Sequence, residues 1–222
     1  MSKGHKIAMD IGLTGGVVPG PAGSGRRERR ALETRVRLFR CALKLFAERG
    51  FQNVTVEDIT EAADVGKGTF FNYFDTKDHV LGVMVEIQLG KVAHAAELAA
   101  EGKKTIHYVL HKLALALAEE PGRSPGLARA VISSFLASES VRAIIGRNMC
   151  EGQKTIAAVV AAGQQRGEIE PRLDSLKVAL QLQQSMMGTV LLWSLHEKPA
   201  LRALIEDSFQ QFWKSIAVAG KT

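Results

Sequence analysis

Two helix-start signals lie close together in the stretch TVEDITEAADVGKGTFFNYFDTKD, residues 55–78, and their spacing limits what this part of the chain can form. Thr55 and Asp58 make a Thr-x-x-Asp box, which is a common beginning of a helix. Asp75 or Thr76 is suited to cap the next long helix. Only short helices fit between these two signals.

The segment between the signals contains Gly66 and Gly68, which weaken helix propensity. It therefore predicts a helix of about two turns, a tight turn and a second short helix. The 20 residues from Thr55 to Phe74 have the length of a helix-turn-helix unit. A longer amphipathic helix precedes them, because apolar residues recur at intervals of three and four and stop at Gly50. These apolar positions are Leu32, Val36, Phe39, Leu43 and Phe46.

Helical periods continue through the rest of the chain, and no segment has the alternation of a convincing strand. Breaks rich in proline and glycine separate six further helical segments. They are expected at about residues 76–100, 103–119, 126–138, 140–166 and 174–196, and from Pro199 onward. We therefore predict an all-α protein of about nine helices. Its expected parts are a flexible basic tail at 1–30, a helix-turn-helix domain at 31–78 and a larger helical domain at 79–222.

The beginning of the chain is rich in glycine and then in arginine. Residues 1–25 hold seven of the 21 glycines, and this composition buries too little apolar surface to offset the entropy of ordering. Residues 26–40 hold seven arginines against two glutamates. Such a basic run favours an anionic partner, nucleic acid first, whereas a charged tail followed by a solvated helix face is the alternative.

The sequence gives no sign of a membrane or secreted protein. No apolar run approaches the roughly 20 residues that span a bilayer, and the N-terminus has no long apolar segment typical of a signal peptide. Cys41 and Cys150 lie far apart in helical patterns, so we expect buried thiols rather than a disulfide framework. These features predict a cytoplasmic protein with no membrane partner.

The stretch GKGTFFNYF, residues 66–74, places four aromatic residues within five positions. On a helix, Phe70 and Phe74 are four residues apart and can both pack inward. The polar residues near the opposite face offer hydrogen bonds to phosphates and base edges; they are Lys67, Thr69, Asn72 and Tyr73. Gly66 and Gly68 would let the backbone approach a nucleic acid closely. The alternative is an ordinary short helix whose aromatic residues are all core.

The segments ALKLFAERGF and VTVEDITEAADVGKGTFFNYFDTKDHVL closely resemble the DNA-binding motif of TetR-family (tetracycline-repressor-like) transcriptional regulators. The resemblance covers about residues 34–85. It includes the end of the long first helix, the Thr-x-x-Asp-Ile helix start, the short recognition helix with its glycines, the Tyr-Phe pair and the lysine that follows. Residues 86–222 resemble the family only in their helical layout.

The resemblance implies a role in DNA binding for individual residues. Thr55 would present its hydroxyl and the helix N-terminus to a phosphate, and Lys67, Gly68 and Thr69 occupy positions that approach bases or phosphates. Tyr73 and Lys77 occupy phosphate-contact positions. Asn72 is a candidate reader of a base edge, and Phe71 stands where many members have tyrosine. The basic arm that would follow phosphates or enter the minor groove comprises Arg26, Arg27, Arg29 and Arg30.

The resemblance further implies a homodimer that regulates transcription, most simply as a repressor. Such a protein binds a palindromic operator in double-stranded DNA and is released by a small-molecule effector, here unknown, that binds the helical domain at 79–222. No enzymatic activity and no cofactor are expected. The alternatives are a helical interaction protein without DNA binding and, less simply, a small-molecule enzyme built on a helical bundle.

The sequence does not match the motifs of a phosphate-binding loop, a metal site or a catalytic site. GKGT lacks the glycine that a phosphate-binding loop needs at position 61, which is Glu61. His107 and His111 are four residues apart, but no third ligand is apparent, so we interpret them as packed or solvated residues rather than a metal site. No catalytic arrangement of serine or cysteine with histidine is recognisable. We interpret Met186, Met187 and Trp193 as core or interface residues rather than as the lining of a pocket.

Overall fold

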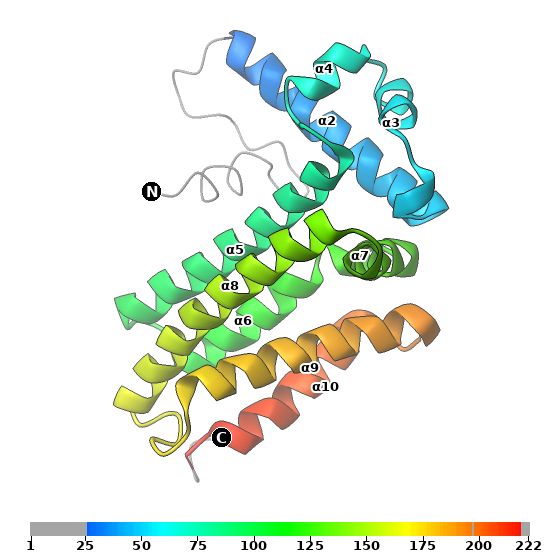
Figure 1. Cartoon of the computed structure of the whole chain (residues 1–222). Helices are drawn as coiled ribbons and strands as arrows, with labels where there is room; N and C mark the ends of the chain where they lie inside the picture. The colour runs from blue at the N-terminus through cyan, green and yellow to red at the C-terminus, as the bar shows by residue number, and fades with distance from the viewer. Residues whose placement is uncertain (1–25, 197, 219–222) are drawn as a thin grey trace.

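The computed structural model describes residues 26–196 and 198–218. In this part of the chain it contains nine α-helices and two short 3₁₀-helices, as the sequence predicts for an all-α protein (Figure 1). The helices are α2 (Arg26–Arg49), η1 (Phe51–Asn53), α3 (Val56–Ala62), α4 (Lys67–Phe71), α5 (Lys77–Glu101), α6 (Ile106–Ala118), η2 (Pro121–Arg123), α7 (Pro125–Ala137), α8 (Glu139–Gln165), α9 (Ser175–His196) and α10 (Leu201–Ile216).

Helices α2, α3 and α4 form a three-helix unit at one end of the molecule (Figure 1). The predicted helix start at Thr55 is present, since Thr55 and Asp58 form a reciprocal capping box. Asp64, with φ 50°, supplies the tight turn between α3 and α4, a left-handed conformation that aspartate tolerates better than most residues. Phe70 and Phe74 are both buried, which confirms that they anchor the short helix to the core.

Helix α5 joins this unit to the rest of the molecule. Of its two predicted caps, Thr76 is the one used, because its side chain accepts a hydrogen bond from the His79 amide at 3.2 Å. Its first half, up to Ile87, belongs to the core of the three-helix unit, and its second half, from Val92, belongs to a separate core. The expected domain boundary after residue 78 therefore falls within the first turn of α5, and the two cores separate further along the same helix.

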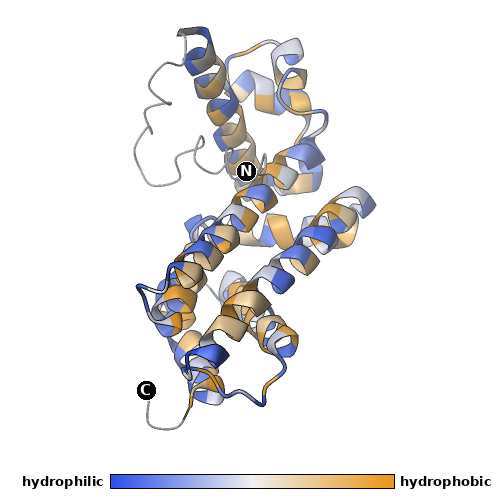
Figure 2. Ribbon diagram, turned by 90° about the vertical axis from the view of Figure 1, so that its left-hand side faces the viewer, coloured by the Kyte–Doolittle hydropathy of each residue, from blue (hydrophilic) through white to orange (hydrophobic). Residues whose placement is uncertain are grey.

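The second core is built from α5, α6, α8, α9 and α10, which pack as a helical bundle. Its largest buried side chains include Phe209, Trp213 and Trp193. Figure 2 shows the three-helix unit at one end and this bundle at the other, with hydrophobic and hydrophilic residues mixed along the helices as amphipathic packing requires. Helix α7 lies at the junction and contributes Leu127, Ala130 and Val131 to the core of the three-helix unit.

Some expectations need correction. The flexible tail was predicted to extend to residue 30, but α2 already begins at Arg26, because the glycines and prolines end at Gly25 and the arginine and glutamate residues that follow favour a helix. Residues 1–25 lie outside the described part of the chain.

The last helix begins at Leu201 rather than Pro199. Both cysteines are free thiols, but neither is fully buried as expected: Cys41 is half-buried, and Cys150 on α8 is exposed.

No helix among the described residues is long and apolar enough to cross a membrane.

Candidate nucleic-acid interface

Helix α4 presents a small polar surface at the exposed end of the three-helix unit. Lys67, Gly68 and Asn72 are exposed, and Thr69 is half-buried. The Lys67 ammonium forms an ion pair with the Glu57 carboxylate of α3 on the surface. The hydrogen bond from Lys67 lowers the pKa of Glu57. An exposed pair of this kind contributes little to stability and can exchange partners when another anion approaches.

The two glycines of this surface are not required by the fold around them. Gly66 is the N-cap of α4 with φ −71°, so neither it nor Gly68 adopts the left-handed backbone that favours glycine. A Cβ added to Gly66 or Gly68 would have no heavy atom of the described chain within 4 Å. These positions therefore leave the backbone of α4 open to a partner from outside the chain.

The Thr55 hydroxyl is already used within α3. It donates to Asp58 Oδ2 at 2.6 Å and accepts from the Asp58 amide at 3.1 Å. Hydrogen bonds from Thr55, together with the nearby Arg49 guanidinium, lower the pKa of Asp58. The predicted contact between this hydroxyl and a phosphate does not fit, because its hydrogen is donated to a carboxylate. The amide of Val56 is the first-turn donor that remains for an external anion, since the Glu57 amide bonds to its own carboxylate.

Lys77 has an internal role in the structure. Its ammonium donates to the backbone carbonyls of Phe51 and Val54, each at 3.0 Å, and lies 4.7 Å from the centre of the Phe51 ring. A third carbonyl, that of Gln52, lies at 3.4 Å. The predicted phosphate contact therefore needs correction: the ammonium holds the start of α5 against η1, and its donors face the protein.

A shallow groove separates the end of α4 from α2. Asn72 and Tyr73 line it on one side, and Ala31, Leu32 and Arg35 line it on the other. Tyr73 is half-buried against the core, and Phe71 is 47% exposed beside it in sequence. Arg35 Nε is buried with no hydrogen-bond partner among the described residues. Arg35 was not predicted to be a site residue from the sequence. It belongs to the arginine-rich run, and one helical turn separates it from Leu32.

The basic residues at the start of α2 are part of a helix and not of an extended arm. Arg27, Arg29 and Arg30 are exposed, and the side chain of Arg26 lies outside the described part. The end of α2 that carries them lies close to α4 (Figure 1). The structure therefore brings cationic side chains from α2 and α4 to the same end of the molecule.

The described residues contain no group of three or more histidine, cysteine, aspartate or glutamate side chains that could hold a metal ion. His107 and His111 stack with their ring centres 6.0 Å apart and contact Phe209. Trp213 packs against His107 at 4.9 Å. Burial, followed by the neighbouring His111, lowers the pKa of His107. The packing interpretation of this pair therefore fits the structure.

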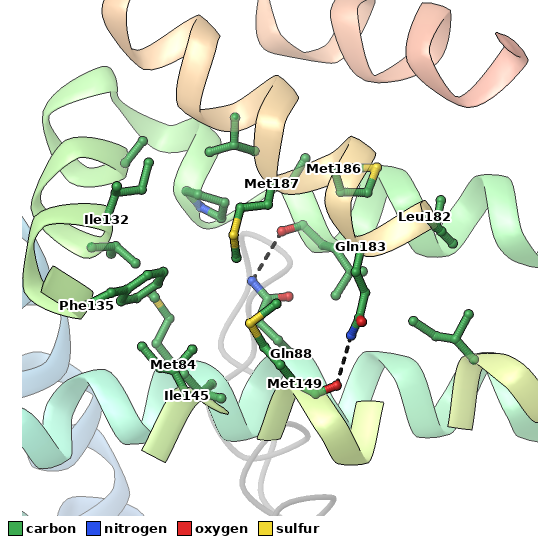
Figure 3. Close-up of a pocket in the computed structure, with 18 residues that line it drawn as sticks. Met84, Gln88, Ile132, Phe135, Ile145, Met149, Leu182, Gln183, Met186 and Met187 are labelled. Carbon is green, nitrogen blue, oxygen red and sulfur yellow. Dashed lines mark hydrogen bonds between the residues drawn. The ribbon is translucent and has the colours of Figure 1, made fainter. Parts of the chain in front are cut away.

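A cavity of about 230 Å³ lies between α5, α7, α8 and α9 (Figure 3). Met186 belongs to the second core, as predicted. Both Met186 and Met187 also line the cavity, which was not predicted because apolar pocket walls and apolar core look alike in a sequence. Trp193 is a buried core residue, as predicted.

Residues 38–84 match the family described as "Bacterial regulatory proteins, tetR family". This part of the chain matches the TetR family. The matched residues include all of α3 and α4, which confirms the resemblance found in the sequence. Arg26, Arg27, Arg29 and Arg30 precede the part that the family description covers.

Two curated relatives differ in how much of the chain they match. The transcriptional regulator TcmR of Streptomyces glaucescens is 45% identical over 60 residues, which are 27% of this chain and 26% of TcmR. The match thus spans about a quarter of that relative's length. The transcriptional regulator UidR of Escherichia coli K12 is 22% identical over 146 residues, 65% of this chain and 74% of UidR.

Solved structures share the fold of most of this chain. SmeT, the repressor of the multidrug efflux pump SmeDEF of Stenotrophomonas maltophilia, aligns with a TM-score of 0.69 at 16% identity, over 85% of this chain and 92% of SmeT. FadR of Bacillus subtilis, solved in complex with stearoyl-CoA, aligns with a TM-score of 0.61 at 22% identity, over 81% of this chain and 98% of FadR. At these identities the likeness concerns the fold alone.

Proposed function

We propose that this TetR-family protein is a DNA-binding transcriptional regulator, and not an enzyme, that represses genes by occupying a palindromic operator as a homodimer. A small-molecule effector would release it. We place its action in the cytoplasm because its proposed partner is DNA. The observation that carries the proposal is the surface of α4, where Lys67 and Asn72 flank a backbone that Gly68 leaves open.

The proposed contacts divide by type. The surface of α4 enters the major groove, where Lys67, Thr69 and Asn72 donate hydrogen bonds to base edges or phosphates. The free Val56 amide at the start of α3 and the arginines of α2 bind the backbone of the duplex. We add Arg35 to these contacts, because its side chain lines the groove between α2 and α4 beside Tyr73 and Asn72, and a guanidinium group suits a phosphate.

The proposed dimer interface is the exposed face of α9. Five apolar residues spaced by four or seven positions share one helical face and are each at least 39% exposed; they are Leu176, Leu180, Met187, Leu191 and Leu195. Gly188 lies at the edge of this face, with no heavy atom within 4 Å of an added Cβ. A contiguous apolar face of this kind indicates a protein interface, and a small residue beside it allows close approach of a second helix.

In the proposed release mechanism, two helices connect the cavity to the three-helix unit that binds DNA. Helix α5 contributes Met84 to the cavity wall and is anchored by Lys77 at the three-helix unit. Helix α7 contributes Ile132 and Phe135 to the cavity wall and packs on α2 at its other end. An effector changes DNA affinity only if it binds one arrangement of these helices better than the other, and DNA then changes effector affinity by the same factor.

A gel-shift experiment tests the proposed recognition helix. Duplexes that bind the wild type are selected from a random pool and then titrated with Lys67→Ala and Thr69→Ala variants. Both variants should bind more weakly, by up to about tenfold or more for a base contact. Lys154→Ala, which removes an exposed lysine of α8, is the matched control and should bind like the wild type. Undiminished binding by both α4 variants would refute the assignment of α4.

A further inference from the structure

The cavity between α5, α7, α8 and α9 has one hydrogen-bonding group that nothing in the described chain satisfies. We propose that it takes a neutral, largely apolar molecule carrying a hydroxyl or N–H donor, and that the side-chain oxygen of Gln88 accepts this donor. The inference rests on the proposed function, in which a small-molecule effector binds the helical domain, and it specifies the chemistry of that effector.

The cavity wall excludes a charged ligand. Eighteen residues line the cavity, and none of them is aspartate, glutamate, lysine, arginine or histidine. An ionised group placed among these side chains would lose its hydration without gaining a counter-ion. The wall includes four methionines, Met84, Met149, Met186 and Met187, whose flexible side chains adapt to apolar ligands of different shape.

The side-chain amide of Gln88 has only one possible orientation. Its Nε2 lies 3.2 Å from Glu120 Oε2 and 3.2 Å from the Leu117 carbonyl oxygen. Lys91 Nζ lies 2.5 Å from the same Glu120 oxygen, so the carboxylate is held as the acceptor of an ion pair. A carboxylate and a carbonyl only accept hydrogen bonds, and therefore both must face the NH₂ group of Gln88 rather than its oxygen.

This orientation leaves the Gln88 oxygen without a partner. Gln88 Oε1 is buried and has no hydrogen-bond partner among the described residues, while Gln88 itself lines the cavity (Figure 3). Both donors of the amide are used, so the group can serve a ligand only as an acceptor. A buried acceptor left unsatisfied is costly, which means that a ligand carrying a donor gains more from this site than one of equal shape without a donor.

Gln183 is the other polar side chain of the wall and serves as a matched control. Its Nε2 donates to the Met149 carbonyl at 3.0 Å (Figure 3). It is a glutamine in the same cavity, but its side-chain oxygen is not among the buried acceptors without a partner. Replacing Gln183 should therefore change the shape of the wall without removing the acceptor that selects the ligand.

Ligand-dependent thermal unfolding of the full chain tests the inference. The probes are 1-naphthol and 1-decanol, the methyl ether of each, and the carboxylates 1-naphthoate and decanoate. For at least one scaffold the wild type should bind the alcohol about tenfold more tightly than the ether, and the carboxylate least well. Gln88→Met should bind alcohol and ether equally, and Gln183→Met should keep the preference.

Three results would overturn the inference: no binding of either alcohol, equal binding of alcohol and ether by the wild type, or tightest binding of the carboxylate. The comparison of alcohol and ether binding by the wild type tests the inference even if Gln88→Met fails to fold. DNA binding of the ligand-free protein is measured on the same preparation. It would persist if only the ligand chemistry is wrong, and its loss would instead count against the proposed function.

Discussion

A Cβ placed on Gly126 would lie 2.3 Å from the backbone carbonyl oxygen of Ala47. The beginning of α7 is thus in direct contact with the end of α2, and only glycine allows this approach. Further along α7, Ala128 and Val131 line the cavity. One helix therefore touches both the three-helix unit and, within about a turn and a half, the cavity, which makes α7 a direct physical connection between the two.

Gly126→Ala should separate α7 from α2. The obstructing atom belongs to the backbone and cannot rotate away, so we expect a loss of about 1–3 kcal/mol in the free energy of unfolding. Urea denaturation measures this loss. We also expect a changed affinity for DNA, because the relative position of the helices must shift. Unchanged stability together with unchanged DNA affinity would show that the contact is not needed.

The control for Gly126→Ala is Gly146→Ala in α8. Gly146 is exposed, and an added Cβ there has no heavy atom within 4 Å. Alanine is favoured over glycine inside a helix by roughly 0.5–1 kcal/mol, so this variant should be slightly more stable and bind DNA like the wild type.

Gly68→Ala should separate folding from DNA binding. The position has free space around it and an ordinary helical backbone, so stability should stay the same or rise by up to about 1 kcal/mol. Affinity for a selected duplex should fall by about tenfold or more, because the added methyl group keeps the backbone of α4 away from the DNA. Retained affinity would mean that the open backbone of α4 is not a contact surface.

Charged substitutions on α9 should dissociate the proposed dimer. Leu180→Glu or Leu191→Glu would place a carboxylate in the apolar face that meets the second chain, where burial of an unpaired charge is strongly unfavourable. Sedimentation velocity at micromolar concentration should then report monomers. Leu136→Glu, on α7, changes a leucine that is 79% exposed and outside this face, so it should leave the dimer intact.

Acidification should destabilise the aromatic cluster around His107. Burial lowers the pKa of His107 below its ordinary value of 6.5, so the folded chain binds the proton less readily than the unfolded chain. The stability contributed by the neutral ring is therefore complete above about pH 6.5 and is lost as the pH falls from there through the lower pKa of the folded state. Unfolding curves at pH 7.5 and 5.5 should show a larger loss for wild type than for His107→Phe. His94→Gln, which changes an exposed histidine, should behave like the wild type.

The sequence predicted those features that depend on neighbours along the chain. The capping box of Thr55 and Asp58, and the inward packing of Phe70 and Phe74, follow from spacings of three and four residues. Such local rules were sufficient to find the helices and the surface of α4. They placed the beginning of α2 incorrectly because a run of arginine can continue a helix as well as form an extended arm.

Features that depend on tertiary contacts were not predictable in this way. Lys77 and Lys67 are both lysines at the start of a helix, but one points to carbonyls that the chain brings together from 23 and 26 positions earlier. Met186 and Met187 have the spacing of core residues, and only the packing of four helices reveals the cavity beside them. The orphan oxygen of Gln88 depends on the buried pair of Lys91 and Glu120, which lie 29 positions apart in sequence.

The salt dependence of DNA binding tests the central claim most directly, since it counts contacts with phosphate. The dissociation constant for a selected duplex is measured between about 50 and 200 mM salt for wild type, Lys67→Ala and Lys154→Ala. If Lys67 of α4 leaves Glu57 to bind a phosphate, its removal should reduce the slope of log K against log salt by about 0.9, and Lys154→Ala should leave the slope unchanged. Equal slopes and equal affinities for all three proteins would contradict the assignment of α4 as the helix that binds DNA.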